Sequence, residues 1–429
     1  MDHAVPRRRF LYAAGAAYVA GSMSVAACAP MGFTGNSKPV RLATALDRPH
    51  ELATLFRNKR VAILTHAAGV DRAGRRSIDV LAQLPGVKLA AIWSPEHGLA
   101  GMAAAGDHVG DDRDAVTGLM VHSLYGARKT PSHAMLDAVD AVFVDLQDVG
   151  ARPYTYASTM LEVLKAARAA RTPVFVNDRP NPLGGVVMEG PVLDPALASF
   201  VGVWPIPLRH GLTLGELARM MNGEPRAKEP AINAALTVLP MQGWRRAMET
   251  EVFGAGGLPF VAPSPNLRSL KAIRAYAGTV LFEGTSMSEG RGTDAPFLTL
   301  CAPFLETDRL AAHIGADALA GAVLHYGQVT PVAARYKQQN CGAIRLRITD
   351  PARYRPVEAA VTLIAALLRL YPDKMQFLEG APPFFDLLSG DSRLRTALQK
   401  GADAQRLIVS WQESLSAFAE RRKAWLLYD

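Results

Sequence analysis

The chain has 429 residues, of which 49% are apolar and 20% charged, so it can form two or three domains with a substantial core and is not a disordered chain. Its formal net charge of +8 comes from scattered side chains, without a basic stripe interleaved with aromatic residues, which argues against nucleic-acid binding. Three cysteines are too few for a disulfide framework.

The first 28 residues are typical of an export signal and are not expected to be part of the fold. Arginines at positions 7–9, followed by Phe10 and Leu11, match a twin-arginine signal, and the weakly apolar stretch at 12–27 is too short for a comfortable membrane span. Small residues directly before Cys28 match a lipobox, which predicts a lipid on Cys28; the alternative is an ordinary signal peptide. We therefore expect a linker at 29–45 and a lipid-anchored periplasmic protein.

Strand and helix signals alternate along the first half of the chain. Apolar strands are predicted at 60–65, 87–93, 138–146 and 173–177, and helices at 77–84 and 158–170. Continuous apolar strands separated by helices predict an α/β fold with a parallel sheet covered on both faces.

Each of these four strands runs into a loop that carries polar side chains. In strand order they are His66; Glu96 and His97; Asp148 and Arg152; and Asp178, Arg179 and Asn181. Ligands of open α/β sheets bind beyond the carboxyl ends of the strands, so these loops are expected to form one crevice. The chain has no G-x-G-x-x-G after the first strand, which disfavours dinucleotide binding. It also has no Walker A motif and no G-x-S-x-G elbow.

The second half mixes helices and strands. A helix at 213–221 begins with Thr213 and Glu216 in capping-box spacing, so Glu216 is interpreted as a cap. The segment 256–268 is too rich in Pro and Gly for regular structure. Further predicted elements are a strand at 278–282, a helix at 308–319, a strand at 342–348, and helices at 357–370 and 404–427. Cys301 and Cys341 are interpreted as two buried free thiols.

Seven segments, in this order, resemble the exo-β-N-acetylmuramidase NamZ family, long known as DUF1343. They are 94–98 (Ser-Pro-Glu-His-Gly), 145–156, 178–185, 189–191, 209–211, 263–266 and 282–293. The resemblance implies a Rossmann-like, mostly parallel sheet domain at 46–275, a smaller α+β domain at 276–429, and an active site between them. It also implies a cofactor-free glycoside hydrolase that releases terminal non-reducing N-acetylmuramic acid from peptidoglycan fragments.

Glycoside hydrolysis usually requires two carboxyl groups that flank the scissile bond. Glu96 is the expected acid because it matches the family's acid residue for residue; the alternative is a helix cap. For the second carboxylate, Glu289 ranks ahead of Glu283 and Asp148, because Arg291 beside it would hold it ionised. Covalent, inverting and substrate-assisted mechanisms all remain open, since the separation of the carboxylates is a three-dimensional quantity.

N-acetylmuramic acid carries a lactyl carboxylate that N-acetylglucosamine lacks, so specificity calls for a cation, best a guanidinium. The candidate arginines, each of which could instead form a structural ion pair, are Arg152, Arg179, Arg209 and Arg291. The other candidate substrate-binding residues are His97, Asp148, Tyr154, Asp178, Asn181, His210 and Asn266, with Tyr156 and Trp204 as further aromatic surfaces.

Two other functions compete with this interpretation. A metal-dependent amidase could use His66, His97, Asp148, Asp178 and His210, although no H-E-x-x-H spacing is present and no metal site is expected. A non-catalytic lipoprotein that binds muropeptides would use the same crevice.

Overall fold

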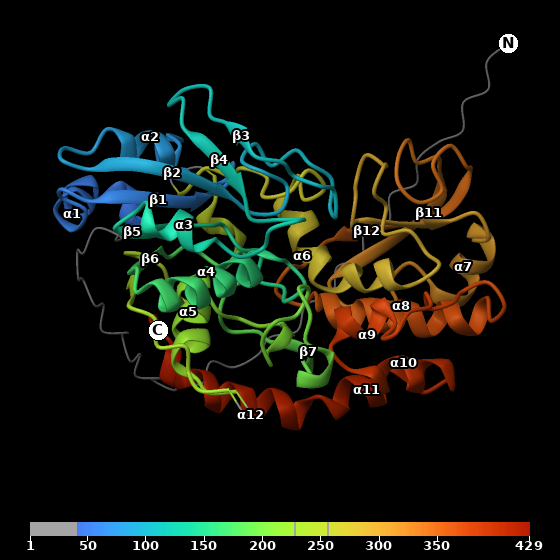
Figure 1. Cartoon of the computed structure of the whole chain (residues 1–429). Coiled ribbons are helices and arrows are strands. Elements are labelled where there is room, and N and C mark those ends of the chain that lie inside the picture. Colours follow the sequence, from blue (N-terminus) through green and yellow to red (C-terminus); the bar gives the residue numbers. More distant parts are fainter. Residues whose placement is uncertain (1–40, 227–228, 255–256) are drawn as a thin grey trace, which may run out of the picture. The chain divides into compact units, whose positions relative to one another are not determined.

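The computed structural model describes residues 41–226, 229–254 and 257–429 (Figure 1). Its main sheet has seven strands. All neighbouring strands are parallel except β3 and β4. In spatial order the strands are β3 (Asp112–Arg113), β4 (Met120–Ser123), β2 (Lys88–Ser94), β1 (Arg60–Thr65), β5 (Ala141–Asp145), β6 (Val174–Asn177) and β9 (Leu236–Leu239). This confirms the predicted parallel sheet.

Helices cover both faces of this sheet. They are η1 (Ala45–Asp47), α1 (Pro49–Leu55), α2 (Ser77–Ala82), α3 (His133–Asp137), α4 (Tyr156–Ala170) and α5 (Leu214–Gly223). Alternate side chains of β1 enter different cores: Ala62 and Leu64 pack with α4 and α5, whereas Val61 and Ile63 pack with α1 and α2. Burial on both faces explains why these strands are apolar without alternation.

A second, smaller sheet is antiparallel, in the order β10 (Thr299–Ala302), β12 (Cys341–Ile348) and β11 (Ala322–Val329). The helices around it are α6 (Leu270–Thr279), η4 (Val280–Gly284), α7 (Thr307–Ile314), α8 (Pro356–Leu370), α9 (Phe384–Ser389), α10 (Ser392–Gln399) and α11 (Ala404–Ser410). Between β6 and β9 in the sequence lie β7 (Glu189–Val192), η2 (Pro195–Leu197) and β8 (Pro207–Arg209), and β7 pairs with β8 in a small antiparallel sheet. The short helix η3 (Thr250–Val252) follows β9. The predicted fold class, a Rossmann-like domain followed by a smaller α+β domain, is confirmed.

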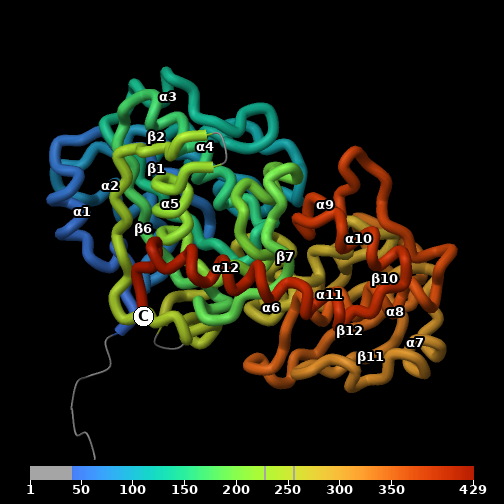
Figure 2. Tube along the Cα trace, turned by 90° about the horizontal axis from the view of Figure 1, so that it is seen from below, coloured from blue at the N-terminus to red at the C-terminus, as the bar shows by residue number. Residues whose placement is uncertain are grey.

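The C-terminal helix returns to the first sheet (Figure 2), where α12 (Gln412–Arg422) and η5 (Lys423–Trp425) lead the chain back to α5. Arg219 of α5 donates hydrogen bonds to the carbonyl oxygens of Trp425 and Leu426. The Tyr428 hydroxyl donates to the Asp178 carboxylate, 2.6 Å away. The chain end is therefore part of the packing around β6.

The predicted strand at 278–282 is wrong, because these residues form the end of α6 and the start of η4. The segment is buried all round, and periodicity cannot separate such a helix from a strand. A Cβ atom on Gly278 would lie 1.8 Å from the Pro356 carbonyl oxygen, so this glycine allows α6 to approach α8 closely. The predicted division of the chain at residue 276 falls inside α6.

Other predicted boundaries need smaller adjustments. The helix predicted at 308–319 ends at Ile314, where Gly315 takes a positive φ of 73°, and the helix predicted at 404–427 is divided into α11, α12 and η5.

Cys301 and Cys341 are buried and free, as predicted. The predicted signal at 1–28 with Cys28, and residues 29–40 of the predicted linker, lie outside the described residues. Residues 42–45 are buried, and Ala43 pairs with Gln242. No helix in the described ranges is long and apolar enough to cross a membrane.

Candidate active site

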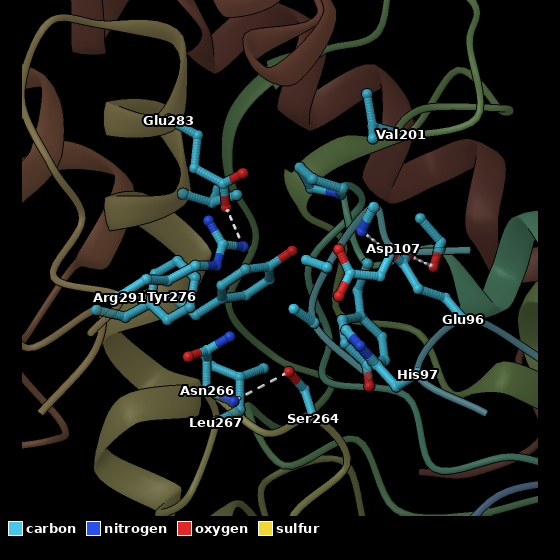
Figure 3. Close-up of a pocket in the computed structure, with 18 of the residues that line it drawn as sticks. Glu96, His97, Asp107, Val201, Ser264, Asn266, Leu267, Tyr276, Glu283 and Arg291 are labelled. Carbon is cyan, nitrogen blue, oxygen red and sulfur yellow. Dashed lines mark hydrogen bonds and ion pairs between the residues drawn. The ribbon is translucent and has the colours of Figure 1, made fainter. Parts of the chain in front are cut away.

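A cavity of about 670 Å³ lies beyond the carboxyl end of β2 and is lined from both parts of the fold. Figure 3 shows Glu96, His97 and Asp107 on one side of it and Tyr276, Glu283 and Arg291 on the opposite side. The first group follows β2, whereas the second comes from α6, η4 and the loop after η4. Two walls with carboxyl groups thus face one another across the cavity.

Glu96 is held in place through both carboxylate oxygens. Its Oε1 accepts a hydrogen bond from the Gly106 amide at 2.9 Å, and its Oε2 accepts one from the Thr155 hydroxyl at 2.5 Å. Thr155 lies at the start of α4, so a rigid helix fixes one side of the carboxylate. Glu96 is only 7% exposed, and these two partners leave its orientation little freedom.

His97 lies beside it with an uncommon backbone conformation. Its φ of 72° is in the left-handed region, which a non-glycine residue adopts at a cost and which is enriched at functional sites. Nδ1 lies 2.8 Å from the Ala103 carbonyl oxygen and must donate to it, since a carbonyl only accepts. Burial lowers the His97 pKa, so the ring is neutral and its Nε2 can accept a hydrogen bond.

On the opposite wall, one guanidinium joins two carboxylates. Arg291 lies 2.9 Å from Glu283 Oε1 and 2.8 Å from Glu289 Oε1. Burial raises the pKa of Glu283 to about 7; Glu289 and Glu96 add to this rise, and Arg291 opposes it. Glu289 does not line the cavity and serves to hold Arg291, so the expectation that it ranks first as the second carboxylate is not supported by its position.

Comparison with known proteins defines the family. The models for the N-terminal and C-terminal parts of the exo-β-N-acetylmuramidase NamZ match residues 61–271 and 274–428. The chain belongs to the NamZ family. The peptidoglycan β-N-acetylmuramidase NamZ of Bacillus subtilis (strain 168) is 38% identical over 409 residues, which are 95% of this chain and 96% of the relative. The predicted family and enzyme class, a glycoside hydrolase, are confirmed.

Two solved structures support the same conclusion about the fold. Both are DUF1343 family proteins from Bacteroides fragilis NCTC 9343. One is 30% identical with a TM-score of 0.82, covering 91% of this chain and 99% of its own length. The other is 29% identical with a TM-score of 0.72, covering 90% and 99%. The NamZ-family fold is therefore shared over nearly the whole described chain.

The structure brings six of the predicted site residues to the cavity of this NamZ-family member. They are Glu96, His97, Tyr154, Asn266, Glu283 and Arg291. Tyr154 contributes its ring, because its hydroxyl donates to the Pro263 carbonyl oxygen at 2.7 Å.

The other three candidate arginines lie outside the cavity lining and have structural partners. Arg179 binds Asp145 at 2.6 Å, and Arg209 binds Glu189 at 2.8 Å, with all four side chains buried. Arg152 donates to the carbonyl oxygens of Pro191, Ile206 and Leu388. The ion-pair alternative that the sequence left open is correct for Arg179 and Arg209, whereas carbonyl oxygens and not a carboxylate hold Arg152. None of the three lines the cavity.

The remaining candidates also stabilise the fold. Asp178 accepts hydrogen bonds from Thr213, Gly215 and Tyr428, and burial raises its pKa to about 7. Asn181 donates to the Leu212 carbonyl oxygen. Asp148 accepts from the Gly150 amide and lies 3.5 Å from His210, which in turn accepts from the Leu212 amide. Trp204 donates to Glu224 at 3.0 Å. None of these residues lines the cavity.

The five residues of the alternative metal site do not form one cluster, although Asp148 and His210 are neighbours. His66 accepts from the Gln147 amide and contacts the Tyr156 hydroxyl, whereas Asp178 follows β6 and accepts from the Gly215 amide in the first turn of α5. Within the described ranges, no group of three or more His, Cys, Asp or Glu side chains is arranged to hold a metal ion. The amidase alternative therefore lacks its ligand set here.

Sequence reasoning missed several residues that line the cavity. They are Asp107, Tyr125, Lys129, Thr155 and Tyr276. Tyr276 is buried between the rings of Tyr154 and Phe297, at centroid distances of 6.2 and 4.9 Å, and presents its phenol beside Glu283. No sequence motif marks Lys129 or Asp107, since both lie in irregular loops after strands. Thr155 could have been found from its place in the 145–156 segment.

We predict that Arg152→Met destabilises the protein without weakening substrate binding. The substitution removes the Arg152 donors from three buried carbonyl oxygens, of which that of Ile206 keeps another donor, the Leu193 amide. This should lower the free energy of unfolding by about 2–4 kcal/mol. Chemical denaturation measures this loss, with the exposed Arg57→Met as the matched control. Michaelis constants within about 3-fold of the wild type are expected below the unfolding transition. A KM increase without loss of stability would instead assign Arg152 to the substrate.

Proposed function

We propose that this chain is an exo-acting β-N-acetylmuramidase that removes the terminal non-reducing N-acetylmuramic acid from peptidoglycan-derived fragments. The observation that carries the proposal is the pair of carboxyl groups, Glu96 and Glu283, on opposite walls of one cavity. Glycoside hydrolysis uses such a pair, with one group protonated and the other ionised. Membership of the NamZ family, and the name of the B. subtilis relative, support the choice of sugar.

Glu283 is the proposed proton donor. Its pKa of about 7 means that it keeps a proton near neutral pH, which a general acid requires. Arg291 occupies only its Oε1, so Oε2 can direct a proton into the cavity. This assignment exchanges the roles expected from the resemblance, in which Glu96 was the acid.

Glu96 is the proposed carboxylate that acts on the anomeric carbon. Each of its oxygens accepts a hydrogen bond, so the carboxylate is held in one orientation on the cavity wall. A fixed carboxylate suits the stabilisation of positive charge in an oxocarbenium-like transition state. The same placement serves a direct attack, activation of a water, or orientation of the substrate's acetamido group.

The pH dependence follows from the Glu283 pKa. The acid must be protonated to act. The titration of Glu283 should therefore leave kcat/KM constant below pH 7 and lower it about 10-fold per pH unit above pH 7. Steady-state rates between pH 5 and 9, on a substrate that does not itself titrate in this range, check the prediction. A kcat/KM that instead rises through pH 7 would mean that Glu283 works in its ionised form.

The test of the function is a comparison of two chromogenic sugars. The full-length chain is assayed on a 4-nitrophenyl β-N-acetylmuramide and on the matching β-N-acetylglucosaminide, each with and without EDTA. We expect release from the muramide, with the glucosaminide much slower and EDTA without effect. Release from neither sugar would reject the proposal, and loss of activity in EDTA would revive the metal-dependent alternative.

We further propose that the protein is exported by the twin-arginine signal and held in the periplasm by a lipid on Cys28. The support is the sequence alone, since residues 1–40 lie outside the described residues. Labelling of cells with a radioactive fatty acid tests the anchor: the wild type should carry label and sediment with membranes, whereas Cys28→Ser should do neither. An unlabelled wild type would contradict the anchor and leave the enzymatic proposal unaffected.

A further inference from the structure

The lactyl carboxylate of N-acetylmuramic acid needs a cation in the substrate cavity, given the function proposed above. The arginines that the sequence offered for this purpose are Arg152, Arg179, Arg209 and Arg291. Three of them are buried away from the cavity with structural partners, which leaves Arg291 to be considered.

Arg291 is poorly suited to bind an anion. Its guanidinium already donates to Glu283 and Glu289, so this cluster has no net positive charge even when Glu283 is protonated. The lactyl carboxylate of a substrate would therefore approach the Arg291 cation together with at least one carboxylate that Arg291 already binds. Like charges in a partly buried cluster disfavour such binding.

Lys129 is the other cation that lines the cavity. It lies in the exposed loop between β4 and α3, and within the described ranges it forms no ion pair with any carboxylate. Its Nζ lies 4.6 Å from the centroid of the Phe200 ring, which also lines the cavity. The ammonium is thus positioned over an aromatic face with its hydrogen-bond donors available.

A series of contacts along the cavity connects Lys129 with Glu96. The Tyr125 ring lies 6.0 Å from the Phe200 ring, and Tyr125 is close enough to Glu96 for that carboxylate to help raise its pKa. Glu96, Tyr125, Phe200 and Lys129 therefore follow one another along the same wall. In the sugar, the lactyl ether at C3 lies two carbons from the anomeric carbon. We infer that Lys129 binds the lactyl carboxylate, with the lactyl methyl group against Phe200, and thereby selects muramic acid over glucosamine.

The test separates recognition of the carboxylate from catalysis. The full-length chain is assayed on the chromogenic muramide, on the same sugar with its lactyl carboxylate converted to the primary amide, and on the glucosaminide. Lys129→Met should raise KM for the muramide by about 10- to 100-fold, with kcat within about 3-fold. It should leave the rate on the lactyl amide unchanged, because no charge is recognised there. Lys129→Arg should keep most of the preference for the carboxylate.

Lys59→Met is a matched control, since Lys59 also lies over an aromatic ring, that of Phe175 at 5.7 Å, but outside the cavity lining. A Lys129→Met variant with wild-type KM on the muramide would overturn the inference, as would an equal loss on the muramide and its amide. If the wild type cleaves neither muramic substrate, the proposed function itself fails. If the wild type cleaves both and only Lys129→Met behaves unexpectedly, the failure is confined to Lys129.

Discussion

Replacement of Glu96 by Gln should lower kcat on a muramide by about 10³-fold. Gln keeps the shape of the side chain, and its amide can still contact Gly106 and Thr155, so the loss would come from the missing charge. Because none of the roles proposed for this carboxylate is protonation of the leaving group, the loss should be similar for a nitrophenyl and for a sugar leaving group.

Thermal unfolding provides the control for this substitution. Glu96→Gln should unfold within a few degrees of the wild type, since the side chain lies on a cavity wall and keeps its hydrogen bonds. Glu379→Gln, which removes an exposed carboxylate outside this cavity, should have full activity. A Glu96→Gln enzyme that retains more than about a tenth of the wild-type kcat would remove Glu96 from the mechanism.

Replacement of Glu283 by Gln should have an effect that depends on the leaving group. An aglycone such as N-acetylglucosamine needs a proton as the bond breaks, so kcat should fall by about 10²- to 10⁴-fold. A dinitrophenyl group leaves without protonation, and there the loss should be about 10-fold or less. The alkaline fall in kcat/KM near pH 7 should disappear in the same variant, because its titrating group is gone.

The contrast between the two variants assigns the acid. Steady-state rates are measured for Glu96→Gln and Glu283→Gln on the disaccharide and on the dinitrophenyl muramide. If Glu96→Gln is the variant rescued by the better leaving group, the acid is Glu96, as the family resemblance suggests, and our assignment is reversed. Equal losses for Glu283→Gln on both substrates would mean that Glu283 acts through Arg291 rather than on the substrate.

Much of the parallel sheet could be predicted from the sequence because its strands are buried on both faces. Residues 60–65 form β1 as predicted, since an unbroken apolar run between turn signals leaves few alternatives. The capping box at Thr213 is also present as predicted, and it could be predicted because it depends only on residues close in sequence. By contrast, β11 was missed: most of its side chains are partly exposed, and its pairing with β12 is a long-range property.

The candidate site was predictable only in part. The rule that ligands bind in loops after strands selected Glu96 and His97, which line the cavity. The same rule also selected Asp178 and Arg179, which are buried partners of other groups. A polar residue after a strand can bind a ligand or hold the loop that binds it, and residue type does not separate the two. Lys129 could not be predicted, because its proposed role depends on a cavity that segments far apart in the sequence form together.

The most direct test of the account is cleavage of two defined disaccharides by the full-length chain, with Glu96→Gln in parallel and the products identified by mass spectrometry. One substrate carries N-acetylmuramic acid at its non-reducing end, and the other carries N-acetylglucosamine there. We expect the wild type to release free N-acetylmuramic acid from the first substrate and to leave the second intact, and we expect Glu96→Gln to cleave neither. Cleavage of the second disaccharide, or of neither by the wild type, would contradict these expectations.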